Sequence, residues 1–138
     1  MWLLGLFAPD KPGDSAYKLQ CSIGTGDTII EKLDQYIGQQ GIAGYACVLL
    51  TPDDEGHKAG IPEEKKYRAR QNVVLELGMV LARLGRRKVA ILHKESVDLP
   101  SDIAGLIYMP FTERVDEVKG RLLQELRAAG INVQAVGL

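Results

Sequence analysis

Three short runs of consecutive apolar residues constrain the fold most, and they lie at residues 45–50, 89–92 and 106–109. Runs without alternation are typical of strands that are covered on both faces, as in a parallel sheet. Longer segments with helical periodicity separate these runs, and such an order indicates strands joined by covering helices. The sequence therefore predicts an α/β fold in which helices flank a parallel sheet.

Amphipathic helices are predicted over three segments with apolar residues at a 3.6-residue period: 28–37, 62–84 and 113–129. Thr28 with Glu31 forms a capping box at the first helix start. Pro62 suits the first position of the second helix. Gly85 and Gly130 follow the second and third segments, where glycine commonly ends a helix.

The two ends of the chain carry weaker patterns. Residues 1–23 show no clear element, so we expect an irregular N-terminal segment followed by a single domain over residues 24–138. Residues 131–136 alternate between apolar and polar side chains, which predicts a short strand at a sheet edge.

Charge and cysteine content exclude several classes of protein. Lys and Arg total 17 against 18 Asp and Glu, so a net charge of −1 gives no reason to expect nucleic acid or a membrane surface as partner. No apolar stretch is long enough to span a bilayer. Cys21 and Cys47 form no disulfide framework, and we expect a cytoplasmic protein. His57 and His93 are far apart in sequence, so no metal site is predicted.

Glu76 is the most informative residue of the second predicted helix. At about 100° per residue it lies roughly 80° from the centre of the apolar stripe, at the border of the buried face. Asn72 and Arg68 precede it by about one and two turns and would share its strip. A carboxylate among apolar neighbours can have a raised pKa or can face a cationic ligand. A border glutamate paired with Arg83 explains the same pattern.

Two loops are candidates for ligand contacts. The first, residues 51–56, leaves the predicted carboxyl end of a strand, where ligands bind in open α/β sheets. There Asp53 and Asp54 could accept hydrogen bonds from ribose hydroxyls or hold a divalent ion, and ordinary turn chemistry is the alternative. The second loop, residues 22–28, contains glycines and enters a helix, so it could hold a phosphate or simply cap the helix.

Several strings together resemble one known family: residues 48–56, 68–78, 84–86 and 99–105, followed by Tyr108. They are similar to the bacterial TIR-like nucleotide-binding domains, effectors in the cyclic-nucleotide-triggered antiphage systems CBASS and Pycsar and in TIR–STING proteins. The resemblance covers roughly residues 24–130. It implies a flavodoxin-like TIR fold.

The resemblance also implies an activity, namely NAD+ cleavage at the nicotinamide–ribose bond with Glu76 as the catalytic residue. NAD+ is then a substrate, and no cofactor is implied. The expected partners are NAD+ or another nucleotide, further copies of the chain on activation, and a cyclic-nucleotide-sensing partner. Together with the loop and helix patterns, the resemblance indicates these substrate-binding residues: Thr51, Asp53, Asp54, Arg68, Arg70 and Asn72.

The start of the chain departs from the family pattern. Family members normally begin with a strand, a helix and a second strand before the segment that matches residues 24–32. No such strand is evident here, so we expect an N-terminally truncated domain. We expect enzyme activity if the strand-helix-strand unit is present or is replaced by another segment. Two alternatives stay open. One is a nucleoside deoxyribosyltransferase-like N-glycosidase, and the other is a non-catalytic module that binds a nucleotide or assembles with partners.

Overall fold

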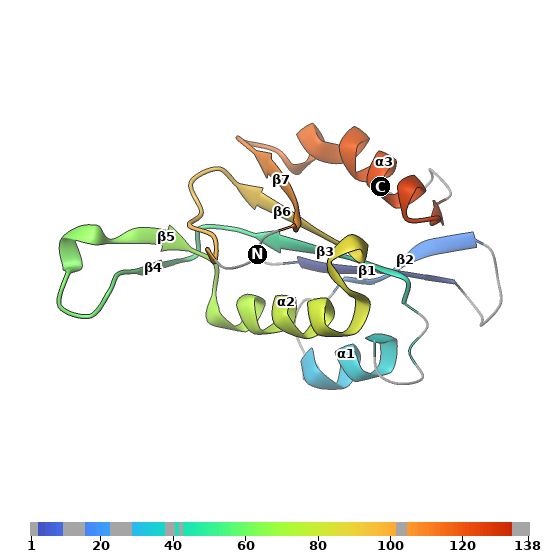
Figure 1. Cartoon of the computed structure of the whole chain (residues 1–138), viewed down its shortest axis with the longest axis horizontal. Coiled ribbons are helices and arrows are strands. Elements are labelled where there is room, and N and C mark those ends of the chain that lie inside the picture. The colour runs from blue at the N-terminus through green and yellow to red at the C-terminus, as the bar shows by residue number, and fades with distance from the viewer. Residues whose placement is uncertain are drawn as a thin grey trace.

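The computed structural model describes residues 3–9, 16–22, 29–37, 41, 43–101 and 105–133, and it has the α/β architecture that the sequence predicts (Figure 1). Its strands are β1 (Leu3–Pro9), β2 (Ala16–Ser22), β3 (Tyr45–Leu50), β4 (Asp54–Gly56), β5 (Lys66–Arg68), β6 (Val89–Lys94), β7 (Ile107–Phe111) and β8 (Asn132–Val133). Its helices are α1 (Ile29–Ile37), α2 (Gln71–Leu84) and α3 (Lys119–Ala128), with short 3-10 turns η1 (Pro62–Glu64), η2 (Arg86–Lys88) and η3 (Val115–Val118).

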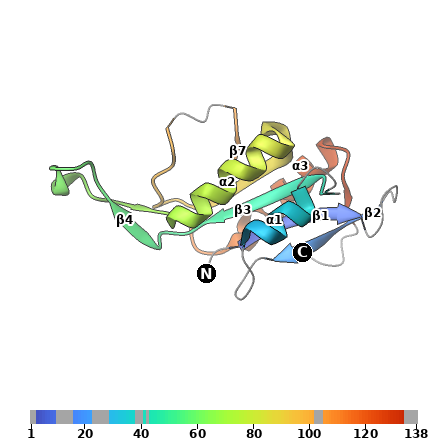
Figure 2. The same ribbon diagram turned by 90° about the horizontal axis from the view of Figure 1, so that it is seen from below.

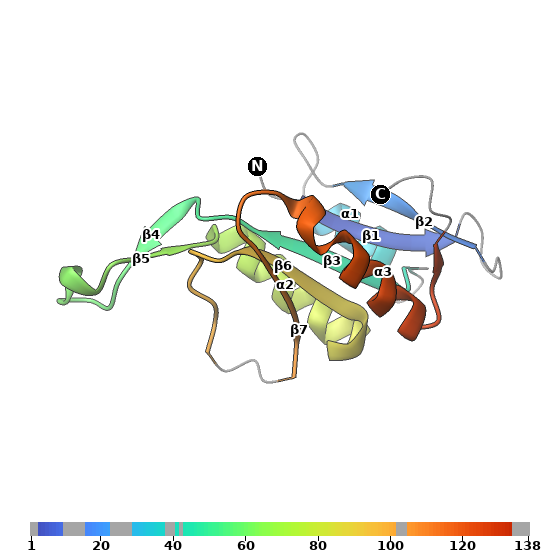
Figure 3. The ribbon, with the colours of Figure 1, turned by 90° about the horizontal axis from the view of Figure 1, so that it is seen from above.

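Six strands form one sheet in the order β7-β6-β3-β1-β2-β8. Helices α1 and α2 lie side by side on one face, as Figure 2 shows from below, and α3 lies on the other face, as Figure 3 shows from above. Strands β4 and β5 form a separate hairpin that projects from the end of the body (Figure 1). The helix-flanked sheet confirms the predicted fold class.

Successive side chains of the central strands point to opposite faces of the sheet, and both faces are covered, which explains why these strands are apolar without interruption. In β3, Val48 and Leu50 pack into the cluster beneath α1 and α2, whereas Tyr45 packs into the cluster beneath α3. In β6, Ile91 belongs to the first cluster and Leu92 to the second. Each strand is thus buried on both sides, which favours the pairing of β3 with β6 at the centre of the sheet.

The sheet is mixed because β1 runs against both of its neighbours. Strand β3 is parallel to β6, and β6 is parallel to β7, as predicted, but β1 is antiparallel to β2 and to β3. Within β1, Leu6 and Phe7 point to opposite faces, and each is at most 1% exposed. Strand β7 forms one edge of the sheet and contains the exposed Pro110, which has no N–H to donate.

The expectation of an irregular segment over residues 1–23 is wrong for β1 and β2. These strands depend on pairing with residues far along the chain, such as Gly5 with Cys47, which local patterns do not reveal. Two strands therefore precede α1, although we expected the N-terminal strands to be missing. The division at residue 24 remains a prediction. The cap at Thr28 and the loop over residues 23–28 lie outside the described residues.

The helix predicted over residues 62–84 is shorter than expected, because α2 begins only at Gln71. Pro62 starts the 3-10 turn η1 instead, and β5 then pairs with β4. All three residues of β5 are exposed, and residues 62–70 contain few apolar side chains, so a helix over this stretch would have little apolar face to bury. Since packing of such a face supplies most helical stability, strand pairing prevails there.

The last predicted helix divides into η3 and α3. Val118, Leu122 and Leu126 are buried, whereas Val115 is 40% exposed and lies outside the buried stripe. Gly130 has a φ of 77°, which suits a glycine after the helix end. Strand β8 then pairs with β2 at the sheet edge, as the alternating pattern predicts. No helix in the described part of the chain is long and apolar enough to cross a membrane.

Candidate functional site

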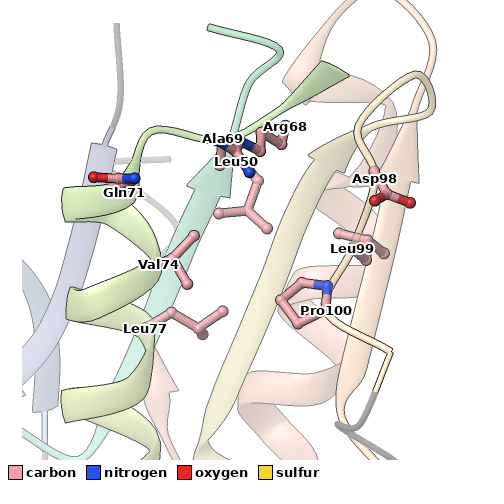
Figure 4. A pocket seen from close by; sticks show the side chains of 9 residues that line it. All are labelled: Leu50, Arg68, Ala69, Gln71, Val74, Leu77, Asp98, Leu99 and Pro100. Carbon is pink, nitrogen blue, oxygen red and sulfur yellow. The ribbon is translucent and has the colours of Figure 1, made fainter. Parts of the chain in front are cut away.

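A cavity of about 330 Å³ opens at the carboxyl end of β3, between the start of α2 and the loop after β6 (Figure 4). Its walls are mainly apolar, and its volume lies within the usual range for small-molecule sites. It is lined by Leu50, Arg68, Ala69, Gln71, Val74, Leu77, Asp98, Leu99 and Pro100. The side chains of Leu50, Val74 and Leu77 approach from one side, and Leu99 and Pro100 approach from the other (Figure 4).

The parallel pairing of β3 with β6 creates this site. Leu50 is the last residue of β3, and the Asp98–Pro100 segment follows β6. Because β3 and β6 are parallel, both lie beside the carboxyl ends of these strands. In open α/β sheets ligands bind at this edge. Leu77, which is only 1% exposed, contributes to the hydrophobic core as well as to the cavity wall.

A second cavity of about 290 Å³ lies against the β4–β5 hairpin. Its lining is mostly polar: Gly56, His57, Lys58, Glu64, Lys66, Arg68 and Asp98. Arg68 and Asp98 line both cavities, so these two side chains stand at the boundary between an apolar space and a polar one.

Three of the predicted substrate-binding residues form one connected group after β3. The Thr51 hydroxyl donates a 2.6 Å hydrogen bond to Oδ2 of Asp53. Nε of Arg70 lies 3.8 Å from the same carboxylate oxygen. Arg70 occupies the N-cap position of α2, so this group connects the loop after β3 to the beginning of the helix. None of the three lines either cavity.

Asp54 and Arg68 are directly opposite each other in the β4–β5 hairpin. Arg68 belongs to β5 and not to α2, so the prediction that it shares a helical strip with Asn72 and Glu76 is wrong. Asn72 lies in the first turn of α2 and is exposed, outside both cavities.

Glu76 is the buried acidic residue of α2, with only 2% of its surface exposed. Neither of its carboxyl oxygens has a hydrogen-bond partner in the part of the chain that the structure describes. Burial, which disfavours the charged form, raises the pKa of Glu76 to about 7. Glu76 does not line the cavity, although its neighbour Leu77 does.

The loop after β6 supplies site residues that the sequence reasoning did not single out. Asp98 and Leu99 line the main cavity, and the backbone N–H of Asp98 donates a 2.7 Å hydrogen bond to the carbonyl oxygen of Tyr67. A signal was present, because this loop follows an apolar run that was assigned to a parallel strand. Polar residues after two neighbouring parallel strands are expected to meet at one edge.

His93 and the acidic loops do not form a metal centre in the described ranges, where no three His, Cys, Asp or Glu side chains gather suitably. His93 is 8% exposed, and its ring meets that of Tyr108 edge to face at a centroid distance of 5.9 Å. This packing fits a structural histidine.

Comparisons with known proteins give concordant matches. A family model described as "CAP12/Pycsar effector protein, TIR domain" matches residues 14–113, a range that includes β2 and the whole candidate site. It begins earlier than the range over which the sequence patterns resemble this family. No solved structure gives a significant match.

Three relatives illustrate the similarity. The uncharacterized protein YuaY of Escherichia coli (strain K12) is 44% identical over 104 residues, which are 75% of this chain and 33% of that protein. The Pycsar effector protein BcPycTIR of Burkholderia cepacia is 46% identical over 89 residues, 63% of this chain and 26% of the relative. CD-NTase-associated protein 12 of Sphingobacterium faecium is 35% identical over 80 residues, which are 58% of this chain and 24% of that protein. The chain thus spans between about a quarter and a third of the length of these relatives.

Proposed function

Because the chain belongs to the family of CAP12/Pycsar effector TIR domains, we propose that it is the NAD+-cleaving domain of an effector in bacterial antiphage defence. In this proposal Glu76 is the catalytic carboxylate, and the bond that breaks joins nicotinamide to ribose. Relatives named as a CD-NTase-associated protein and as Pycsar effectors support the defence context.

The observation that carries the catalytic role is the state of Glu76. Its carboxyl group is buried and has no hydrogen-bond partner among the described residues, which is costly for a group with a purely structural role. The alternative of a glutamate neutralised by Arg83 predicts a hydrogen-bonded ion pair, and neither carboxyl oxygen of Glu76 has a hydrogen-bond partner among the described residues. Buried titratable groups with strongly shifted pKa values occur frequently at functional sites.

The chemistry needs one carboxylate. When the bond between C1′ of the ribose and the nicotinamide nitrogen breaks, its electron pair goes to nicotinamide, which leaves as a neutral molecule. Positive charge then develops at C1′ and O4′ of the ribose, and the ionised Glu76 would stabilise it. Water adds to C1′ and releases a proton, giving ADP-ribose. No strong acid is needed, since the leaving group is already cationic in the substrate.

Access to Glu76 is the specific demand of this proposal. Leu77 lines the described cavity, and Glu76 is rotated from it by about 100° around the axis of α2. The reacting ribose must therefore approach α2 beside the cavity wall, and substrate binding must open a path to the carboxylate. We propose that activation provides this path through assembly of several copies, triggered by a partner that senses a cyclic nucleotide.

Release of nicotinamide from NAD+ tests the proposal directly. The chain is assayed by chromatography at rising protein concentration, so that assembled samples are included, alongside Glu76→Gln and the control Glu63→Gln. Glu63 is exposed on η1 and is not a lining residue of either cavity. We expect Glu76→Gln to lower the rate by about 10²–10³-fold and Glu63→Gln to leave it unchanged. Equal rates for Glu76→Gln and the unchanged chain would exclude Glu76 as the catalytic residue, and no release from assembled samples would exclude the activity.

A second function, a non-catalytic nucleotide-binding module, is favoured by one observation: the described cavity does not include Glu76. It predicts that NAD+ binds to the chain with measurable affinity and remains intact. Calorimetry combined with chromatography of the same sample separates the two functions, because only the enzyme produces free nicotinamide.

A further inference from the structure

Arg68 differs from the neighbouring basic residues Lys65, Lys66 and Arg70 in having no acidic partner among the residues that the structure describes. Nζ of Lys65 lies 2.8 Å from Oε2 of Glu55, and Nζ of Lys66 lies 3.5 Å from Oδ1 of Asp98. Arg70 approaches Asp53, as described above. Among the described residues, no ion pair or hydrogen bond joins the side chain of Arg68 to another residue. This holds although Asp54 is its direct neighbour across the hairpin.

The guanidinium group of Arg68 lies over Gly56 instead. A Cβ atom built on Gly56 would overlap the Cζ, Nη1 and Nε atoms of Arg68. In the pairing of β4 with β5, Gly56 is opposite Lys66, so Arg68 reaches diagonally along the hairpin to the glycine. The missing side chain of Gly56 is therefore what allows the guanidinium to occupy this place.

This place is the boundary between the two cavities. On one side are the apolar walls formed by Leu50, Val74 and Leu99, which suit a planar ring. On the other side the lining is polar, and the nearby carboxylate of Asp98 is balanced by Lys66. A guanidinium at such a boundary that has no partner in the described part of the chain is suited to bind a phosphate group, often through two parallel hydrogen bonds.

We propose that Arg68 binds a phosphate group of a nucleotide whose ring lies in the apolar cavity, and that Gly56 is the positioning residue that holds the guanidinium there. The proposal deepens the nucleotide chemistry of the proposed function and rests on it. It assigns the discrimination between phosphorylated and unphosphorylated ligands to one residue pair.

A Gly56→Ala variant is well suited to the test because its clash is confined to a side chain. The overlapping atoms belong to the far end of a flexible arginine and not to backbone, so the hairpin can keep its pairing while the guanidinium is displaced. Gly78→Ala is the matched control. Gly78 lies on the exposed side of α2, and a Cβ there would meet nothing within 4 Å.

The experiment measures the affinities of AMP and adenosine by calorimetry, with thermal midpoints recorded for every variant. Neither ligand contains a nicotinamide–ribose bond, so the result does not depend on turnover of NAD+. We expect the unchanged chain and Gly78→Ala to prefer AMP by about ten- to a hundredfold, the usual effect of a charge-assisted hydrogen bond. Arg68→Gln should abolish the preference, and Gly56→Ala should reduce it strongly without lowering adenosine affinity.

The double variant decides whether Gly56 acts through Arg68. If it does, adding Gly56→Ala to Arg68→Gln causes no further loss of AMP affinity. An additive loss would refute the positioning role. The phosphate site would be refuted if the unchanged chain bound AMP and adenosine with equal affinity. It would also be refuted if the unchanged chain bound neither of them. A chain that releases nicotinamide but shows no preference for AMP would retain the proposed function and lose this inference alone.

Discussion

The backbone N–H of Asp98 and the carbonyl oxygen of Tyr67 are joined by a 2.7 Å hydrogen bond. This bond connects the loop after β6 to β5, so it fixes the base of the β4–β5 hairpin beside the cavity. Beyond this point the hairpin projects alone (Figure 1), and the residues from His57 to Gly60 at its turn are exposed. Its base and its tip should therefore differ in stability.

Limited proteolysis should detect this difference. Two isolated strands are marginally stable in water, and Lys58, Lys65 and Lys66 are exposed on the hairpin. We expect trypsin to cleave after these lysines before it cleaves after Arg83 in α2 or Arg121 in α3, as followed by mass spectrometry over time. Earlier cleavage within α2 or α3 would mean that the hairpin is held more firmly than its exposure indicates.

The titration of Glu76 should make the protein less stable as the pH rises. Its pKa is about 7 in the folded chain against 4.5 ordinarily, so between these values the folded state binds more protons than the unfolded state. The free energy of unfolding therefore falls from about pH 4.5 to pH 7, by roughly 3 kcal/mol at 1.36 kcal/mol per unit. Glu76→Gln cannot ionise, and its stability relative to the unchanged chain should rise by that amount between pH 4 and pH 8. Urea denaturation at both pH values measures it, and a constant difference would exclude the shifted pKa.

Glu117 should show the opposite dependence on pH. Its carboxylate accepts 2.9 Å hydrogen bonds from the backbone N–H groups of Thr112, Glu113 and Arg114, and these bonds lower its pKa. The stabilisation is present above the ordinary carboxyl pKa and is lost as the pH falls through the lowered one. Glu117→Gln should thus be less stable than the unchanged chain at pH 7, with the difference shrinking below pH 4. A difference that grows on acidification would contradict this account of the turn before α3.

Two leucines of α2 offer a matched pair for the packing of the helix. Leu77 is 1% exposed and Leu75 is 60% exposed. We expect Leu77→Ala to lower the free energy of unfolding by about 2–5 kcal/mol, since it leaves a cavity in the core. Leu75→Ala should change it by no more than about 0.5 kcal/mol. Chemical denaturation of both variants provides the comparison, and similar losses would show that the helix faces are assigned incorrectly.

Local sequence patterns predicted the central part of the fold well. The apolar runs that became β3 and β6 are buried on both faces, so their composition alone reveals their environment. In the edge strand β7, Met109 and Phe111 are buried in the cluster beneath α3. The helical stripe around Leu77 and Val80 is likewise a local signal. These segments owe their conformation to a hydrophobic pattern that a short window of sequence contains.

The N-terminal strands illustrate what such windows miss. In β2 the alternation of Tyr17, Leu19 and Cys21 with polar residues is the period of a strand, so this signal was available. In β1 the run is interrupted by Gly5, and its stability derives from antiparallel pairing with β3. The direction of a strand between two neighbours depends on tertiary contacts and is not encoded in its own composition.

The candidate site was predicted in part. The loop after β3 and Arg68 were identified, and Arg68 lines the cavity. The placement of Arg68 on a helix was wrong, because polar residues before α2 gain more from pairing with β4 than from a helix without an apolar face. The contact of Gly56 with the Arg68 guanidinium and the place of Asp98 in the cavity lining depend on how separate segments of the chain pack together, so they are visible only in the folded chain.

Pro110 in the edge strand β7 has a consequence for how copies of this domain can associate. An edge strand with free N–H and C=O groups is a template on which a strand from another molecule can add, and this leads to aggregation. Proline interrupts that template because it offers no hydrogen at its nitrogen. At this edge, therefore, a continuous intermolecular sheet is disfavoured at Pro110, and ordered association of folded copies there must depend on side-chain complementarity.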